Sequence, residues 1–325
     1  MNKAALCLIA AGLCAAAPLA IAKEPKPAKP EPAAQGDGGI DFAGSASNLI
    51  VTSDEGIEWS KDSKEIIARV NAKSVKGNTT VTSDTQTAYY RDKKLLPGAP
   101  VPPPKPEPKP DANPGDSDTG SSEVWRVVAD GNVEIFTPTE HAYGDHADYN
   151  IDDAVVVMTG DHLKMTTPQD IVTSRDTLEY WENKHQAVAR GDAVAVSNQG
   201  KRIQADTLVA DFGENKQKQM VIQLAHGYDH VVLTTPTEVV TGDRADYVVE
   251  TGIVTVTGSV KITRGGNQFD GSYAVVNLNT GISKLLSGPP GGKAADRQVK
   301  GLLVPQPKKA PASAPSTNPP APKVP

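Results

Sequence analysis

Aspartate recurs at regular intervals in this sequence, and its carboxylate is the side-chain group here with the widest range of possible chemistry. Paired carboxylates can act as general acid and base or can bind a cation. A catalytic pair occupies unique positions, whereas this aspartate is repeated seven times. We therefore interpret it as a structural residue at a turn or a strand edge, and we predict no catalytic residue. The seven positions are Asp54, Asp84, Asp145, Asp176, Asp206, Asp243 and Asp270.

Histidine is the other candidate, because its imidazole can bind a metal ion. His226 and His230 fall on one face if the chain is extended there. Four residues at a rise of about 3.3 Å place them roughly 13 Å apart, too far for one ion. No Gly-x-Ser-x-Gly motif, phosphate-binding loop or zinc spacing occurs. We predict no metal site and no cofactor, and we expect that the protein is not an enzyme.

The aspartates mark a repeat with a period of about 30 residues, which is typical of stacked arrays. The repeat is clearest in residues 170–212, where Asp176 is followed by Leu178 and Tyr180 and then by a polar turn. The next stretch, Ala187–Ala195, alternates small apolar and polar residues around Gly191. Side chains alternate faces along a strand, so this spacing lines one face with apolar groups in unit after unit.

The repeat predicts an all-β fold of about seven two-strand units, because no segment shows a helical period. Similar loops recur at one of the two strand junctions of the units, at 137–140, 167–170 and 235–238. Short turns recur at the other junction. This arrangement indicates two facing sheets folded over each other like a V. The apolar pattern slips after Gly160, which predicts a β-bulge, and comes two positions late after Gly227. In the first unit Val70 stands where a glycine is expected.

The two ends of the chain and one internal stretch differ in composition from the repeats. Residues 1–22 are expected to form a secretory signal cleaved after Ala22, and they contain both cysteines, Cys7 and Cys14. Residues 23–44 and 289–325 are rich in Pro, Ala and Lys and are predicted to be disordered, as a linker and a tail. Residues 97–122 are predicted to be a Pro-rich insertion in the folded body, 45–288. The formal net charge of −6 does not suggest nucleic acid as a partner.

Three stretches carry a resemblance to a known family. They are Asp54–Trp59, Ile67–Ala72 and Val81–Arg91, and the signature returns at Ala187–Ala195 and Gln204–Leu208. Together they resemble the OstA-like family of lipopolysaccharide-transport proteins, to which LptA belongs. The resemblance implies an open β-jellyroll, also described as a β-taco, in the periplasm. It also implies binding of the acyl chains of lipid A on the concave face. Partners would be related domains of inner-membrane and outer-membrane components, joined end to end with further copies of this chain.

Two sets of residues follow as candidate sites. The apolar face of the repeats is as consistent with an ordinary core as with a lipid site, and the resemblance favours lipid. The predicted lipid-facing residues are Ile135, Tyr149, Leu178, Tyr180, Leu208, Phe212, Tyr247 and Val260. An open array also leaves unpaired strands at its ends, which can add strands from a partner. The predicted docking residues are Leu49, Val51, Tyr273, Val276 and Leu278.

Two alternatives from other classes stay open at this point. A structural β-solenoid, such as an adhesin or a filament subunit, would use the same repeats and needs no apolar groove. A glycan-active enzyme of the cell envelope would need a cluster of acidic or aromatic residues on an exposed face. Aromatic residues make up 5% of the chain and the aspartates are evenly spaced, which disfavours the enzyme.

Overall fold

The computed structural model describes residues 49–92, 122–216, 218, 220–289 and 298–304. All of them belong to one compact unit, Gly36–Pro325. The expected signal peptide, the linker, nearly all of the Pro-rich insertion and most of the tail lie outside the described residues. In the part of the chain that is described, no helix is long and apolar enough to span a membrane.

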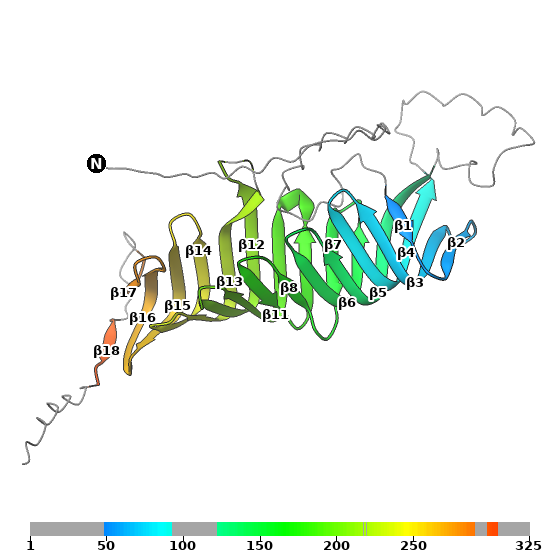
Figure 1. Ribbon diagram of the computed structural model, residues 1–325. Coiled ribbons are helices and arrows are strands. Elements are labelled where there is room, and N and C mark those ends of the chain that lie inside the picture. Colours follow the sequence, from blue (N-terminus) through cyan, green and yellow to red (C-terminus); the bar gives the residue numbers. More distant parts are fainter. Residues whose placement is uncertain (1–48, 93–121, 217, 219, 290–297, 305–325) are drawn as a thin grey trace, which may run out of the picture. The chain divides into compact units, whose positions relative to one another are not determined.

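The described residues form a single antiparallel sheet, which confirms the all-β prediction and exceeds the expected fourteen strands (Figure 1). One 3-10 turn, η1 (Glu182–Lys184), interrupts it. The strands are β1 (Ile50–Thr52), β2 (Gly56–Ser60), β3 (Glu65–Lys76), β4 (Thr79–Asp92), β5 (Ser122–Phe136), β6 (His141–Asn150), β7 (Val155–Thr159), β8 (Lys164–Thr166), β9 (Asp170–Thr173), β10 (Thr177–Trp181), β11 (Gln186–Ser197), β12 (Arg202–Glu214), β13 (Met220–Thr234), β14 (Val239–Val248), β15 (Ile253–Arg264), β16 (Asn267–Asn277), β17 (Ile282–Leu286) and β18 (Lys300–Leu302).

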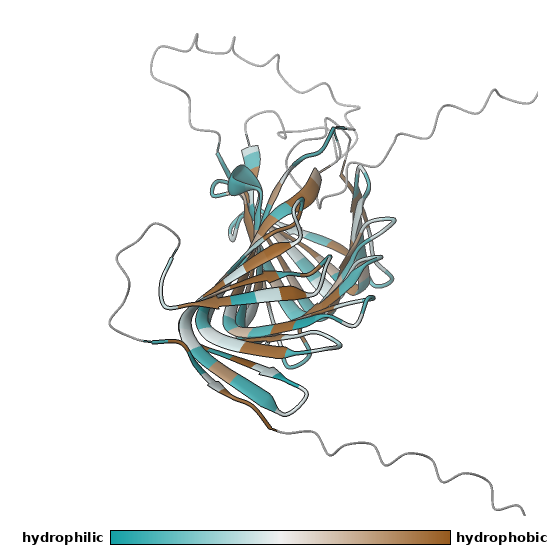
Figure 2. Ribbon diagram, turned by 90° about the vertical axis from the view of Figure 1, so that its left-hand side faces the viewer, coloured by the Kyte–Doolittle hydropathy of each residue, from teal (hydrophilic) through white to brown (hydrophobic). Residues whose placement is uncertain are grey.

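Long strands run through both halves of the sheet, and short strands pair with one half. β2 and β1 both lie beside β3, at different levels. β7 and β8 likewise share β6, β10 and β9 share β11, and β17 and β18 share β16. We name the half that contains β2, β7, β10 and β17 wall A, and the half that contains β1, β8, β9 and β18 wall B. Figure 2, viewed along the array, shows the bent strands stacked one behind another.

A crease separates the two walls, because the long strands change register there. β11, for example, shifts its pairing with β12 between Arg190 and Ala193. Residues at the crease adopt left-handed backbone conformations, which glycine tolerates best. These positions are Val70 and Asn71 in β3, Gly131 and Asn132 in β5, Gly191 and Asp192 in β11, Asp229 and His230 in β13, and Gly258 in β15.

The repeated aspartate packs against this crease. A Cβ added to Gly191 would lie 2.4 Å from Cγ of Asp176 in the preceding unit. The carboxylate also accepts hydrogen bonds from the bent backbone: Oδ2 of Asp243 lies 3.1 Å from the backbone nitrogen of Ser259. The aspartate is thus structural, but it lies at the crease and not at a turn or a sheet edge.

Two hydrophobic clusters fill the space between the walls. The first spans β5 to β11 and the second spans β12 to β16. Each contains residues of both walls, so the apolar faces of the walls meet; we call these the inner faces. The clusters include small residues such as Ala189, Ala193 and Ala205, and Leu208 packs against both clusters. The expected V of two facing sheets is therefore one sheet that is folded at its crease.

Three sequence expectations need correction, and one irregularity of the pattern is explained. The slip after Gly160 is not a bulge, because β7 ends there and β8 begins at Lys164. The late pattern after Gly227 arises because the crease of β13 lies at residues 229–230. The tail predicted as disordered contains β18, which pairs with β16. Finally, Tyr273, Val276 and Leu278 do not lie on the terminal edge: β16 is an inner strand covered by β17 and β18, and Leu278 belongs to the turn that follows it.

Candidate functional site

The inner face of wall A carries an apolar row that runs from strand to strand across the sheet. It follows from the register, since each member lies directly opposite the next one on the neighbouring strand. The row is Val127, Tyr149, Val156, Tyr180, Ala187, Ala210, Ala225, Tyr247, Val254, Val276 and Ser283. It is apolar from β5 to β16 and polar at β17.

Three alanines in the middle of this row form what we call the alanine stretch: Ala187, Ala210 and Ala225. They lie side by side on β11, β12 and β13, between Tyr180 and Tyr247. All three are half-buried, although they belong to the inner face. The alanine stretch coincides with the boundary between the two hydrophobic clusters.

Wall B provides a matching row. It runs through Val81, Ile135, Ala142, Met165, Val172, Ala195, Ile203, Leu233, Val240, Ile262 and Phe269. Here too the middle of the row is a small residue, the half-buried Ala195. Both inner faces are therefore apolar along the sheet, with the smallest side chains on β11 to β13.

The eight predicted lipid-facing residues all lie on the inner faces, but at two depths. Ile135, Tyr149, Leu178 and Val260 are buried in the clusters. Tyr180, Leu208, Phe212 and Tyr247 are half-buried and surround the alanine stretch. The rings of Tyr180 and Phe212 are in edge contact, with centroids 6.1 Å apart. The second group is thus the more accessible part of the predicted site.

Wall B ends in a row of turns, which we call the rim, and three of these turns share one design. They are Thr137–Glu140, Thr167–Asp170 and Thr235–Glu238. In each, the backbone N–H of the Thr donates to the carbonyl of the acidic residue at 2.9 Å. The Thr hydroxyl oxygen accepts backbone N–H groups two and three residues on, as such turns commonly do. Each acid lies two residues before an inner-face residue of the following strand, so its side chain belongs to the inner face.

The environments of the three acids differ. Burial raises the pKa of Glu140 and of Asp170, and neither carboxylate has a hydrogen-bond partner within the described ranges. Glu238 is 4% exposed and is paired: its Oε2 lies 2.7 Å from Nη2 of Arg264. Its other oxygen, Oε1, accepts the hydroxyl of Ser283. Because Ser283 belongs to wall A, we call the contacts of Glu238 with Arg264 and Ser283 the clasp.

The unpaired Asp170 lies near the alanine stretch. It is the direct cross-strand neighbour of Ser197, whose hydroxyl oxygen is buried without a partner in the described structure. From wall A, Tyr247 approaches the same place: burial raises the pKa of its hydroxyl, and the charge of Asp170 raises it further. Asp170 thus approaches the same row of wall A that Glu238 contacts at Ser283, but it makes no hydrogen bond there.

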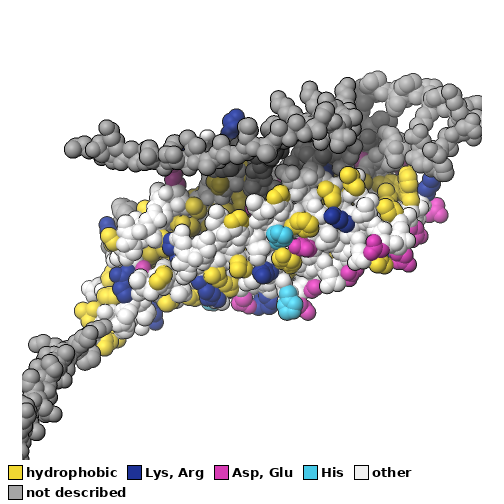
Figure 3. All heavy atoms as spheres, in the orientation of Figure 1, with side chains coloured by type: hydrophobic (Ala, Val, Ile, Leu, Met, Phe, Trp, Pro, Cys, Tyr) yellow, Lys and Arg dark blue, Asp and Glu magenta, His cyan; other side chains and the backbone are white. Residues whose placement is uncertain are grey.

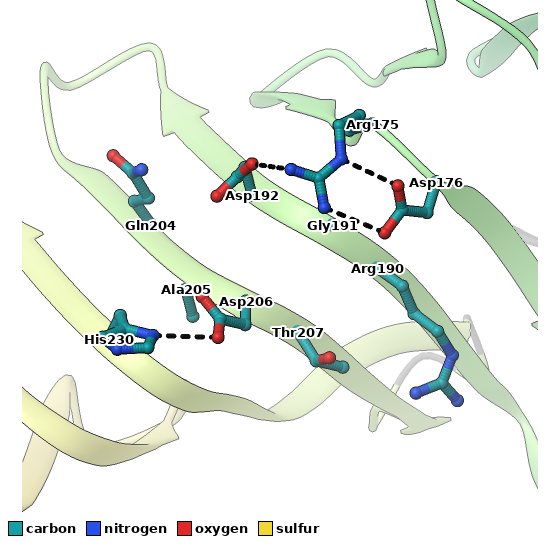
Figure 4. Close-up of a pocket in the computed structure, with 10 residues that line it drawn as sticks. All are labelled: Arg175, Asp176, Arg190, Gly191, Asp192, Gln204, Ala205, Asp206, Thr207 and His230. Carbon is teal, nitrogen blue, oxygen red and sulfur yellow. Dashed lines mark hydrogen bonds and ion pairs between the residues drawn. The ribbon is translucent and has the colours of Figure 1, made fainter.

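A hollow of about 540 Å³ lies on the crease and is polar (Figure 4). Its cations are already paired with acids. Arg175 binds Asp176 and Asp192, and the hydrogen bond with Asp176 raises the pKa of Arg175. Nδ1 of His230 lies 2.9 Å from Asp206. No three His, Cys, Asp or Glu side chains gather as a metal-binding group anywhere in the described ranges.

The two ends of the sheet expose apolar and charged residues. At the first end, the predicted docking residues Leu49 and Val51 lie beside and within β1, and Ile57 and Trp59 of β2 are exposed. At the other end Ile282, Leu302 and Leu303 are exposed, and Figure 3 shows apolar side chains gathered at the β18 end. The charges differ: residues 49–62 contain four acids and one Lys, whereas the described residues from 282 onward contain Lys284 and Lys300 and no acid.

Sequence reasoning missed the rim acids and the clasp. The three related turns recur in the sequence, and the acid at the fourth position of each is the available signal. Their different environments could not be read from the turns, because the partners of Glu238 lie 26 and 45 residues away.

Comparison with protein families finds a match over residues 174–282, to the family described as LptA/(LptD N-terminal domain) LPS transport protein. This range extends from just before β10 to the first residue of β17 and includes the alanine stretch. The chain is therefore similar to that family there, and the match names the LptD N-terminal domain together with LptA.

Among solved structures, the chain is similar to the crystal structure of LptH, the LptA-homologous periplasmic component of the lipopolysaccharide transport device of Pseudomonas aeruginosa. The identity is 17%, with 42% of this chain and 95% of that chain covered, at a TM-score of 0.36. A comparison with curated proteins finds no match.

Proposed function

We propose that this protein binds lipopolysaccharide by its acyl chains, on the inner faces around the alanine stretch, and carries it across the periplasm towards the outer membrane. The observation that carries the proposal is the pair of apolar rows that run from strand to strand along both walls. The family match supports the same function, because it spans the alanine stretch and its family is one of lipopolysaccharide transport proteins.

The energetics of lipid transfer explain why a continuous row matters. Each methylene group exposed to water costs about 0.8 kcal/mol, so a chain of a dozen carbons costs roughly 10 kcal/mol. A carrier therefore needs an apolar lining without interruption along the path of the chain. Half-buried residues beside small alanines provide such a lining. They favour the lipid carrier over the adhesin or filament subunit, which needs no accessible interior.

Photo-crosslinking tests this function directly. A photoreactive residue at Leu208 or Tyr247 should capture lipopolysaccharide in cells, because both side chains border the alanine stretch. The control is Val209, which lies next to Leu208 in β12 but projects from the opposite face. Equal capture from positions 208 and 209 would contradict binding on the inner face.

We also propose that copies of the chain, or related domains of the inner-membrane and outer-membrane components, join head to tail into a bridge. Both ends of the sheet have a strand edge and exposed apolar residues, so strands of a partner could be added at either end. The acidic first end and the basic last end are complementary, which favours a contact between unlike ends.

Charge exchange separates this arrangement from other associations. The variant Lys284→Glu/Lys300→Glu and the variant Glu55→Lys/Glu58→Lys should each self-associate less than the parent in sedimentation velocity. A mixture of the two should recover association, since each then presents one altered end that complements the other. If the mixture associates no better than either variant alone, the ends do not pair in this way.

A further inference from the structure

Three polar groups stand together beside the alanine stretch without partners. The Asp170 carboxylate, the Ser197 hydroxyl and the Tyr247 hydroxyl have no hydrogen bond to any described residue. The Ser197 oxygen is buried, so leaving it unpaired costs free energy, whereas the Asp170 carboxylate and the Tyr247 hydroxyl are half-buried. The unpaired state of this trio requires a reason.

The turn itself does not supply that reason. Glu238 occupies the same position in a turn with the same backbone hydrogen bonds, and there the carboxylate is satisfied by Arg264 and Ser283. The turn that contains Asp170 is held by Thr167 and by the backbone, so its fourth residue need not be acidic. An acid at position 170, opposite Ser197 on the inner face of wall B, is therefore available for a contact with something other than the turn.

The position of the trio points to a ligand. Asp170 and Ser197 project from wall B, and Tyr247 projects from wall A next to Ala225, a member of the alanine stretch. A lipid whose chains lay on the alanine stretch would bring its polar part to these three groups. On this basis we infer that Asp170, Ser197 and Tyr247 form a head-group site that binds hydroxyl or amide hydrogens of the lipid. This inference rests on the proposed lipid-binding function.

The chemistry of the trio sets the class of ligand group. An ionised carboxylate only accepts hydrogen bonds, so Asp170 requires a donor, while the two hydroxyls can donate or accept. A phosphate or a second carboxylate beside Asp170 would be repelled. Sugar hydroxyls and amide N–H groups meet the requirement, and both are neutral.

Two detergents with the same chain test the site in the full-length protein. Dodecyl maltoside carries sugar hydroxyls, whereas dodecyldimethylamine oxide has a head group without hydroxyl or amide hydrogens. Titration calorimetry below the critical micelle concentration should show the maltoside binding about tenfold more tightly to the parent, as expected for a hydrogen bond to a charged group. Asp170→Ala should remove most of this preference and leave binding of the amine oxide within about twofold. Tyr247→Phe, which keeps the ring beside the alanine stretch, should also reduce the preference.

Glu140→Gln is the matched control, because Glu140 occupies the same position in an equivalent turn but is not one of the three proposed head-group residues. It should retain the tenfold preference. Equal binding of the two detergents to the parent, or an unchanged preference in Asp170→Ala, would overturn the head-group site while leaving the lipid-binding function intact. If neither detergent binds and position 208 captures no lipopolysaccharide, the proposed function itself fails.

Discussion

The crease and the rim of wall B both carry acids at repeating positions, but they use them differently. At the crease, Asp54 and Asp84 accept hydrogen bonds from Asn71 and Asn132, at 2.6 and 3.0 Å. At the rim, one acid of the three equivalent turns, Glu238, has a side-chain partner in the described structure. The hydrogen-bond partners of a crease acid are part of the bend itself. Whether a rim acid has a hydrogen-bond partner depends on the residues that lie opposite it. An acid that repeats with the same kind of partner is structural. An acid that repeats without a partner, as at the rim, is a candidate for binding.

The largest expected effect comes from filling the crease. Gly191→Ala places a methyl group 2.4 Å from Cγ of Asp176 and 2.9 Å from its backbone nitrogen, at a φ of +83°. We expect a loss of about 3 kcal/mol in the free energy of unfolding, from the left-handed backbone and the overlap together. Urea denaturation measures it.

Gly200→Ala is the control for the backbone contribution. Gly200 has a φ of +74°, and nothing lies within 4 Å of an added Cβ. It should lose only about 1 kcal/mol. Equal losses in the two variants would show that the contact with Asp176 does not shape the crease.

The next effect concerns the clasp. Glu238→Gln removes the charge that faces Arg264 in a nearly buried position, and we expect a loss of about 2 kcal/mol. Glu140→Gln changes the equivalent acid of an unpaired turn and should cost almost nothing. Comparable losses in the two variants, measured by the same denaturation, would mean that the clasp does not distinguish these turns.

A substitution at Val70 should have a smaller effect on stability, and of the opposite sign. It is a β-branched residue with a φ of 60° at a crease position that glycine occupies in other strands. Val70→Gly should stabilise the protein by about 1 kcal/mol, since a left-handed conformation costs an ordinary L-residue that much. A decrease in the thermal midpoint would contradict the strain assigned to the crease in β3.

The smallest effect depends on pH. Burial raises the pKa of Asp170, so the folded chain holds this proton more tightly than the unfolded chain does. The resulting stability is present below the ordinary Asp pKa of about 3.9 and is lost as the pH rises through the raised value. Asp170→Asn should therefore be more stable than the parent at pH 7 by a few tenths of a kcal/mol, a small figure because water screens this half-buried group.

The advantage of Asp170→Asn should shrink as the pH falls to about 3.5, where the parent carboxyl is also neutral. Chemical denaturation at the two pH values measures the difference. If Asp170→Asn gained more stability over the parent at the lower pH than at pH 7, the pH dependence would have the opposite sign. Burial of Asp170 would then not be its cause.

Much of the fold could be predicted from the sequence because its determinants are local. Alternation at Ala189, Ala193 and Ala195 identifies a strand with one apolar face, and the recurring aspartate fixes the length of each unit. The same alternation located all eight predicted lipid-facing residues on the inner faces. It could not separate the buried Ile135 from the half-buried Tyr247, since depth depends on the opposite wall.

Tertiary structure alone decided the partners of the acids and the identity of the edge. Asp84 meets Asn132 48 residues away, and Glu238 meets Ser283 45 residues away, because strands that are distant in sequence become neighbours when the sheet folds at its crease. The sequence pattern places Val276 on the terminal strand, but β17 and β18 lie beside β16 and cover that edge. Local alternation specifies which face of a strand is apolar, but the bend at the crease determines which residue of the other wall that face meets.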